Sequence, residues 1–253
     1  MNLITKIILF LALILFTFNA NYAQTSFTRS DYITILKANG MVLENAWTGG
    51  FNSVQFSEID MNLDGIKDLF VFDKTGNRVS TFINQGIANQ VSYKYDPSYI
   101  SYFPKDFSHW VLMRDYNCDG KMDIMAFHSA GIKAYKNTST TQLSFVLDTI
   151  AIQSNYQPDG VASHLSLHVT PTDLPVIDDI DGDGDLDILT FGILFANHVE
   201  YHKNLSVETT GNCDGFIYEL SNKCWGFFHE NVANNNVTLF DTCQYNINHP
   251  QKP

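Results

Sequence analysis

Short apolar runs separated by turn-forming residues dominate the chain after residue 50. The runs are rich in aromatic and β-branched residues, as in Leu69-Phe70-Val71-Phe72, and Gly, Asn and Asp follow them closely. Runs of this kind are typical of β-strands. The pattern predicts an all-β fold with strands at residues 53–58, 68–72, 78–83, 91–95, 110–114, 123–127, 132–136, 143–147, 176–178, 187–191, 199–203 and 216–220.

Three of the predicted strands are preceded by the same nine-residue pattern, D-x-[DN]-x-D-G-x-x-D. The copies are Asp60–Asp68, Asp115–Asp123 and Asp179–Asp187. A second shared register follows at Phe82-Ile83-Asn84, Tyr135-Lys136-Asn137 and His202-Lys203-Asn204. The first Asp recurs after 55 and then 64 residues (60 to 115 to 179). The repeat is therefore a unit of several strands joined by loops of variable length.

The nine-residue pattern has the chemistry of a calcium loop. Calcium takes six to eight oxygen ligands, and carboxylates spaced by two residues in a tight loop can converge on one ion. In the first copy the oxygens would come from the side chains of Asp60, Asn62, Asp64 and Asp68 and from the carbonyl of Ile66. Gly65 allows the sharp turn that such a loop needs. Magnesium fits less well, since it prefers tighter octahedral geometry and keeps more of its water.

Two other interpretations explain the pattern less well. An EF-hand requires a bidentate Glu at loop position 12 and flanking helices. The residues at that position are Val71, Ala126 and Thr190, and the flanks are predicted strands. A metal-free Asx-rich turn would explain a single copy, because Asp, Asn and Gly dominate turns. Three copies in register, each with an Asp at position nine, favour calcium with a structural role in holding a hairpin turn.

These motifs resemble the FG-GAP/VCBS family of repeats, which includes the repeats of integrin α-subunit propellers. The resemblance covers roughly residues 50–205 and implies a β-propeller of four-stranded blades with a calcium loop between the first and second strands. By matching position it implies three structural Ca²⁺ ions, held by Asp60, Asn62, Asp64, Ile66 and Asp68, by Asp115, Asn117, Asp119, Lys121 and Asp123, and by Asp179, Asp181, Asp183, Asp185 and Asp187. Ile66, Lys121 and Asp185 would contribute backbone carbonyls.

The repeat also predicts how the chain is organised. A closed propeller has about four to eight blades, and the sequence has three calcium loops. We therefore expect an incomplete ring that is a fragment of a longer propeller protein. The alternatives are an open arc of blades and an arc whose exposed edges are covered by a partner. The predicted segments are a signal peptide (1–23), an N-terminal strand and loop segment (24–50), blade 1 (51–104), blade 2 (105–150), blade 3 with an insertion (151–222) and a Cys-containing C-terminal segment (223–253).

The amino-terminal residues have the pattern of a signal peptide. Lys6 precedes an apolar run from Ile7 to Phe18, and the small and polar residues Asn19–Ala23 follow it. The run is too short to span about 30 Å of hydrocarbon comfortably, which favours cleavage after Ala23. No later segment is apolar enough to span a bilayer, and no Cys near the cleavage site could carry a lipid. We expect a secreted or cell-surface protein without a transmembrane anchor.

Export makes the cysteines candidates for disulfides, and four cysteines permit three pairings. Cys213, Cys224 and Cys243 crowd the last fifth of the chain, while Cys118 stands apart. This spacing predicts a bridge within the late group, with Cys224–Cys243 preferred. A metal site built from these cysteines is disfavoured, since the chain has no C-x-x-C pair.

No group of residues indicates a reaction centre, and we expect no catalytic residues. The chain has no G-x-S-x-G elbow, no phosphate-binding loop and no G-x-G-x-x-G motif. Two histidine pairs have a spacing of four, His164 with His168 and His198 with His202. Each pair would share one face of a strand, which leaves a transition-metal site as an alternative to surface or sheet-face histidines.

Composition and charge narrow the function. The 253 residues include 15 Lys and Arg against 27 Asp and Glu, and 45% are hydrophobic, which argues against disorder and against a general nucleic-acid binder. Loss of Lys6 with the leader takes the net charge from -12 to -13, and three Ca²⁺ ions would bring it to about -7. We expect an exported, non-catalytic module that binds an extracellular protein or glycan in adhesion. The alternatives are the propeller portion of a secreted enzyme whose catalytic domain lies outside this chain, and a structural spacer.

Overall fold

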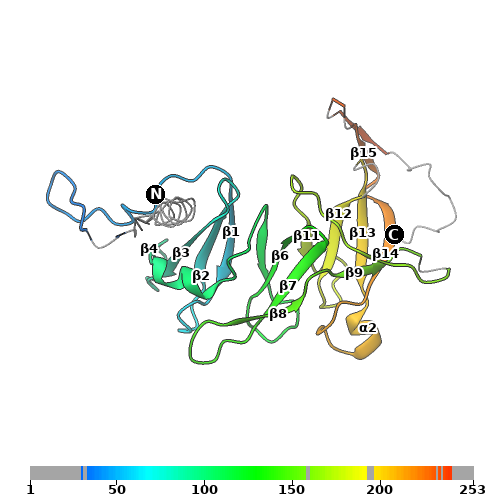
Figure 1. Ribbon diagram of the computed structural model, residues 1–253, viewed down its shortest axis with the longest axis horizontal. Helices are drawn as coiled ribbons and strands as arrows, with labels where there is room; N and C mark the ends of the chain where they lie inside the picture. Colours follow the sequence, from blue (N-terminus) through cyan, green and yellow to red (C-terminus); the bar gives the residue numbers. More distant parts are fainter. Residues whose placement is uncertain are drawn as a thin grey trace, which may run out of the picture. The chain divides into compact units, whose positions relative to one another are not determined.

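The computed structural model describes residues 30, 33–157, 160–192, 197–231, 233–234 and 236–240 (Figure 1). The chain divides into two units, residues 1–43 and 44–253. In the first unit an antiparallel bridge joins Leu36 to Val42 around a tight turn, in which Gly40 has a φ of 81°. The predicted signal peptide, residues 1–23, lies outside the described residues.

Two sheets of the second unit have the same topology, with four antiparallel strands that follow one another in chain order. The first sheet consists of β1 (Val54–Ile59), β2 (Asp68–Asp73), β3 (Arg78–Asn84) and β4 (Tyr93–Tyr95). The second consists of β5 (Val111–Arg114), β6 (Asp123–His128), β7 (Gly131–Asn137) and β8 (Phe145–Thr149). The short helix η1 (Pro97–Tyr102) lies between the two sheets in the chain, and Asp96 caps it by accepting the N–H of Ser98.

A third sheet has six strands in the order β10-β9-β14-β13-β12-β11. Its strands are β9 (Gln153–Asn155), β10 (His164–Ser166), β11 (Val176–Asp178), β12 (Asp187–Phe191), β13 (Val199–Asn204) and β14 (Tyr218–Trp225). The strands from β11 to β14 are antiparallel neighbours in chain order, whereas β9 pairs with β14 in parallel. The short helix α2 (Ser206–Thr210) connects β13 to β14, and β15 (Phe228–Glu230) forms a separate hairpin with β16 (Val237–Leu239).

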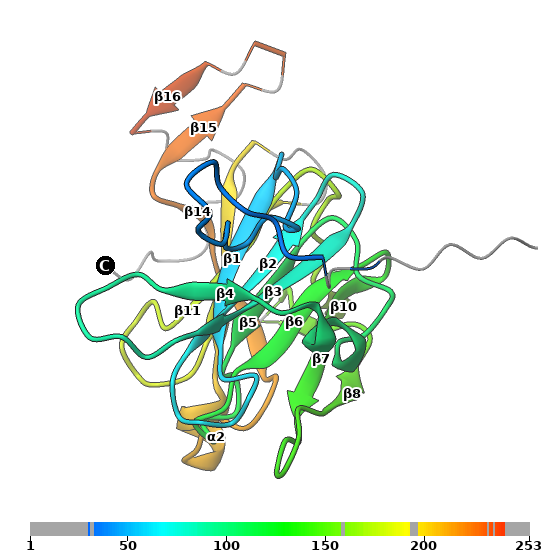
Figure 2. The ribbon, with the colours of Figure 1, turned by 90° about the vertical axis from the view of Figure 1, so that its left-hand side faces the viewer.

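Two hydrophobic cores flank the β5–β8 sheet, one on each face. Side chains alternate across a strand, so neighbouring residues of β5 and β6 enter different cores. The core shared with the first sheet contains Val111, Met113, Ile124 and Ala126 together with Phe70 and Phe72 of β2. The core shared with the third sheet contains Leu112, Met125 and Phe127 together with Ile177 and Ile188. The β5–β8 sheet is therefore packed between the other two, and Figure 2 looks onto β1–β4 with β5–β7 behind them.

The all-β prediction is confirmed, and each predicted strand overlaps a strand of the structure. The strand predicted at 143–147 is found at 145–149. Leu143 is apolar because it is buried in the core from the segment before β8, and not because it belongs to the strand. The strands β9, β10, β15 and β16 were not predicted. Among the described strands no sheet closes on itself, and within the same residues no helix is long and apolar enough to cross a bilayer.

Candidate metal centre

Each copy of the nine-residue pattern forms the connection between two antiparallel strands. The first acidic loop (60–68) joins β1 to β2, the second (115–123) joins β5 to β6, and the third (179–187) joins β11 to β12. In every copy the ninth residue is the first residue of the second strand. The loops therefore occupy the same place in three sheets, and each is held at both ends by a hairpin.

The backbone turns through the left-handed region at the same two positions of each loop. At the sixth position the φ angles are 86° for Gly65, 84° for Gly120 and 102° for Gly184. At the fourth position they are 62° for Leu63, 56° for Cys118 and 82° for Gly182. The sixth position is glycine in all copies because a side chain is disfavoured there. The sequence pattern gave no sign of the fourth, where two copies have a residue with a side chain.

The loops also share one hydrogen-bond network. The first-position carboxylates each accept two backbone N–H groups at 2.8–3.2 Å, Asp60 from Asp64 and Gly65, Asp115 from Asp119 and Gly120, and Asp179 from Gly182 and Gly184. The third-position side chains each accept the N–H of the fifth residue, which holds for Asn62, Asn117 and Asp181. The fifth-position carboxylates accept the N–H of the seventh, which holds for Asp64, Asp119 and Asp183. These bonds turn the side-chain oxygens of alternate residues toward the inside of the loop.

The ninth-position aspartates are fully buried, with 0% of each residue exposed, and they fasten the loop to the sheet. Each accepts one N–H from the second loop residue and one from the Asn that ends the third strand. The donors are Met61 and Asn84 for Asp68, Tyr116 and Asn137 for Asp123, and Ile180 and Asn204 for Asp187. The second register of the sequence repeat therefore has a structural reason, since its Asn supplies the backbone donor for the buried carboxylate.

Burial makes these carboxylates costly to ionise. It raises the pKa of Asp123 to about 7, against the effect of the backbone N–H donors, and the nearby charges of Asp119 and Asp115 raise it further. Burial likewise raises the pKa of Asp68 and of Asp187 above the ordinary value. A divalent cation beside such groups would favour their charged form. The electrostatics of the loops therefore suit a cation.

The third loop gathers its carboxylates most closely. Oxygen atoms of Asp179, Asp181 and Asp187 lie within 4.8 Å of one another. Two oxygens that bind one Ca²⁺ are at most about 5 Å apart, because each lies 2.3–2.6 Å from the ion. A second group consists of Asp181, Asp183 and Glu208. Among the described residues no other three acidic, His or Cys side chains meet in this way, so neither predicted histidine pair forms such a group.

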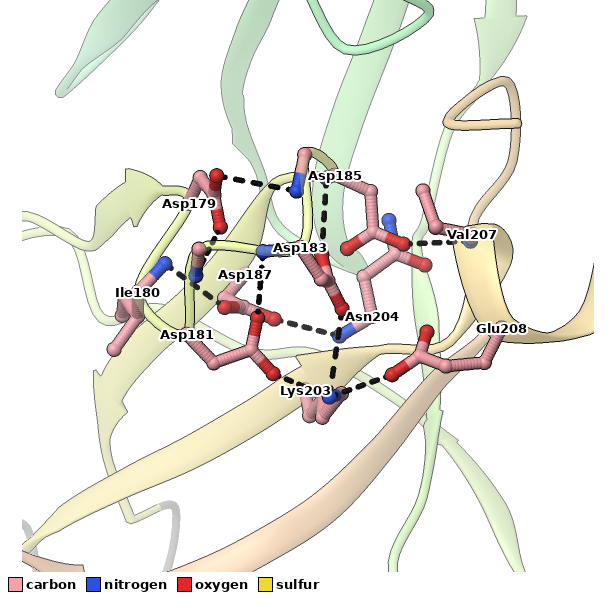
Figure 3. Close-up of polar contacts among 12 residues, drawn as sticks. Asp179, Ile180, Asp181, Asp183, Asp185, Asp187, Lys203, Asn204, Val207 and Glu208 are labelled. Atoms are coloured by element: carbon pink, nitrogen blue, oxygen red, sulfur yellow. Dashed lines mark hydrogen bonds and ion pairs between the residues drawn. The ribbon is translucent and has the colours of Figure 1, made fainter. Parts of the chain in front are cut away.

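Lys203 distinguishes the third loop from the other two. Its ammonium group forms ion pairs with Asp181, with Asp183 at 3.4 Å and with Glu208 of α2 at 2.5 Å (Figure 3). Burial acts to lower the pKa of Lys203, but the hydrogen bonds to Asp181 and Glu208 outweigh burial and raise it. The sequence repeat places Lys203 in register with Ile83 and Lys136, but it gave no sign of these contacts.

Asp185 has a larger role than the predicted carbonyl ligand. Its side chain is fully buried, and one carboxylate oxygen accepts the N–H of Val207 in α2 at 2.9 Å (Figure 3). The other carboxylate oxygen is buried without a hydrogen-bond partner. Burial raises the pKa of Asp185 to about 6. The third loop is therefore joined to α2 through both Asp185 and the pair of Lys203 with Glu208.

A disulfide joins the second loop to the third sheet. It links Cys118 to Cys213, which are 95 residues apart in sequence and have a Cα–Cα distance of 6.1 Å. The spacing of the cysteines gave no sign of this pair, which is compatible with the preferred bridge between Cys224 and Cys243. The preferred pairing of Cys224 with Cys243 falls outside the described residues, because Cys243 is not among them.

Two comparisons of the sequence with known proteins found no match. No model of a protein family matches the chain. No curated protein matches its sequence either.

Proposed function

We propose that the chain is an exported calcium-binding module of the FG-GAP/VCBS type, in which three sheets act as propeller blades. The blades would be β1–β4, β5–β8 and β11–β14. The observation that carries the proposal is the repeated acidic loop, which in three hairpins has the same backbone turns and the same bond from the sixth-position Gly N–H to the first-position carboxylate.

The donor chemistry supports calcium in particular. Carboxylate, amide and backbone carbonyl oxygens are the ligands that calcium prefers, and flexible coordination by six to eight of them suits a short loop. The residues that would hold the ions are the fifteen named from the resemblance, five in each loop. Bound calcium would offset the repulsion among the carboxylates and stiffen the hairpin connection. The buried aspartate at position nine would transmit that stiffness to the third strand through its Asn donor.

The proposed role of the module is to bind an extracellular protein or glycan without catalysis. Support comes from the resemblance to adhesion propellers, from the predicted export and from the lack of a recognisable reaction centre in the sequence. A fold by itself does not establish a function, so the binding role needs its own test.

Screening the full chain on protein and glycan arrays, in millimolar calcium and in chelator, tests the binding role. The expected result is a ligand that is retained in calcium and lost in chelator, because the loops that present the binding surface would be ordered by the ion. Arrays without any calcium-dependent ligand would contradict the binding role. Calcium binding by the loops would be unaffected by that result, because a thermal melt in calcium and in chelator tests it independently.

A further inference from the structure

One short segment of the connection between α2 and β14 lies against the second acidic loop. This clamp segment, residues 212–217, follows α2 and leads into β14. Cys213 is bonded to Cys118, and the ring of Phe216 lies 4.8 Å from the ring of Tyr116. Asp214 adds an ion pair with Lys136 of β7 at 3.6 Å. The clamp segment therefore holds the second loop through a covalent bond and an aromatic contact, and the ion pair joins the clamp segment to β7.

The clamp segment is fixed to its own sheet as well. The N–H of Leu205 donates to the carbonyl of Ile217 at 2.8 Å, and the amide of Asn204 donates to the carbonyl of Gly215 at 3.4 Å. Asn204 is the residue whose N–H also binds the buried Asp187 of the third loop. The second loop is thus bonded to the clamp segment, which hydrogen bonds to Asn204 and Leu205 fix in turn.

The bond reaches the second loop at a position that controls its shape. Cys118 is the fourth residue of the loop, between Asn117 and Asp119, and it has a φ of 56°. Residues with side chains are disfavoured in this left-handed conformation. The corresponding residues of the other loops are Leu63, which has no covalent tether, and Gly182, which needs none. A tether at Cys118 therefore acts directly on the two neighbouring candidate ligands.

We propose that the Cys118–Cys213 disulfide holds the second loop in its calcium-binding shape, so that the calcium affinity of this one loop depends on redox state. The inference rests on the proposed calcium binding. Reduction by a dithiol transfers two electrons and two protons to the bridge, which gives two thiols, while the dithiol becomes a disulfide. Cys118 is then held in the left-handed region only by the loop itself, as the untethered Leu63 is, so the oxygens of Asn117 and Asp119 are less firmly fixed for calcium. The first and third loops keep their shape.

Calcium titration calorimetry on the full chain, oxidised and after treatment with dithiothreitol, tests this inference. The expected result is three sites in the oxidised protein, of which one loses at least tenfold in affinity after reduction. The variant Cys213→Ser should reproduce that loss without reductant, since it breaks the bridge from outside the loop. The variant Cys224→Ser is the control for the remaining cysteines and should leave all three affinities unchanged.

A second variant assigns the lost site to the second loop. Asp119→Ala removes a ligand of that loop. The calcium sites that remain in this variant, in the first and third loops, should therefore have the same affinity before and after reduction. Circular dichroism of each sample reports whether the sheets stay folded. Equal affinities in oxidised and reduced protein would overturn the inference, as would loss of all sites or of the fold on reduction, because the bridge would then not act on the loop alone. Absence of calcium binding in the oxidised protein would instead contradict the proposed function.

Discussion

The variant Asp123→Ala is expected to unfold more easily than the unmodified protein, both in calcium and in chelator. Asp123 is buried and accepts the N–H groups of Tyr116 and Asn137, so alanine leaves two buried donors without acceptors. Each buried donor without an acceptor lowers the free energy of unfolding by about 1–3 kcal/mol. Removing a carboxylate that burial makes hard to ionise offsets part of this loss. We expect a net decrease in the free energy of unfolding of about 1–3 kcal/mol in chelator and, with the stabilisation by calcium lost as well, about 4–6 kcal/mol in saturating calcium, measured by denaturant titration.

A variant in the same loop separates the two roles of Asp123, which are to bind calcium and to fasten the loop to the third strand. Asp119 is exposed and accepts the N–H of Lys121 within the loop, without a bond to another strand. Asp119→Ala should therefore lose the stabilisation by calcium but unfold like the unmodified protein in chelator. If Asp123→Ala also matches the unmodified protein in chelator, the buried carboxylate does not fasten the loop to the third strand.

The variant Lys203→Met is expected to destabilise the calcium-free protein and to strengthen calcium binding by the third loop. Lys203 pairs with Asp181, Asp183 and Glu208, and methionine keeps the length of the stem without the charge. Hydrogen bonds to charged groups contribute about 1.5–3 kcal/mol, so a loss of that order is expected in chelator. Calcium would replace the ammonium as the partner of the carboxylates. The loss of stability should therefore shrink in saturating calcium.

Lys136→Met is the matched control, because the repeat places Lys136 in the same register. Its ammonium pairs with Asp214 at 3.6 Å, and the two side chains are 39% and 58% exposed. Pairs of this kind contribute about 0–1 kcal/mol. Denaturant titrations in chelator and calorimetric titrations with calcium should show a clear effect for Lys203→Met and little for Lys136→Met. Weaker calcium binding in Lys203→Met would show that the ammonium does not compete with the ion.

Much of the fold could be predicted because its strands carry local signals. Apolar runs such as Phe70–Phe72 and Ile124–Phe127 are buried on both faces, and the turns between them have turn residues. β9 and β10 have three residues each; all three are polar in β9, and Leu165 is the one apolar residue of β10. They pair with each other and, through β9, with β14, which is distant in sequence. No local pattern reports such long-range pairing.

The candidate metal site likewise has a part that the sequence predicts and a part that it does not. The fifteen loop residues could be identified because the pattern repeats in register. The contacts that distinguish the loops from one another come from tertiary packing. Lys203 and Glu208 meet the third loop because α2 packs beside it, and Cys213 meets Cys118 across 95 residues of sequence. The pKa of Asp123 likewise depends on burial between sheets, which the sequence does not specify.

A thermal melt of the mature chain in millimolar calcium and in chelator tests the central claim most directly. A ligand that binds only the folded state adds about 2.7 kcal/mol of stability at a hundred times its Kd. For a chain of this size one saturated site should raise the Tm by about 5–10 °C. Magnesium at the same concentration should have a smaller effect, because it fits the loop less well. A Tm that is the same in calcium and in chelator would contradict the account.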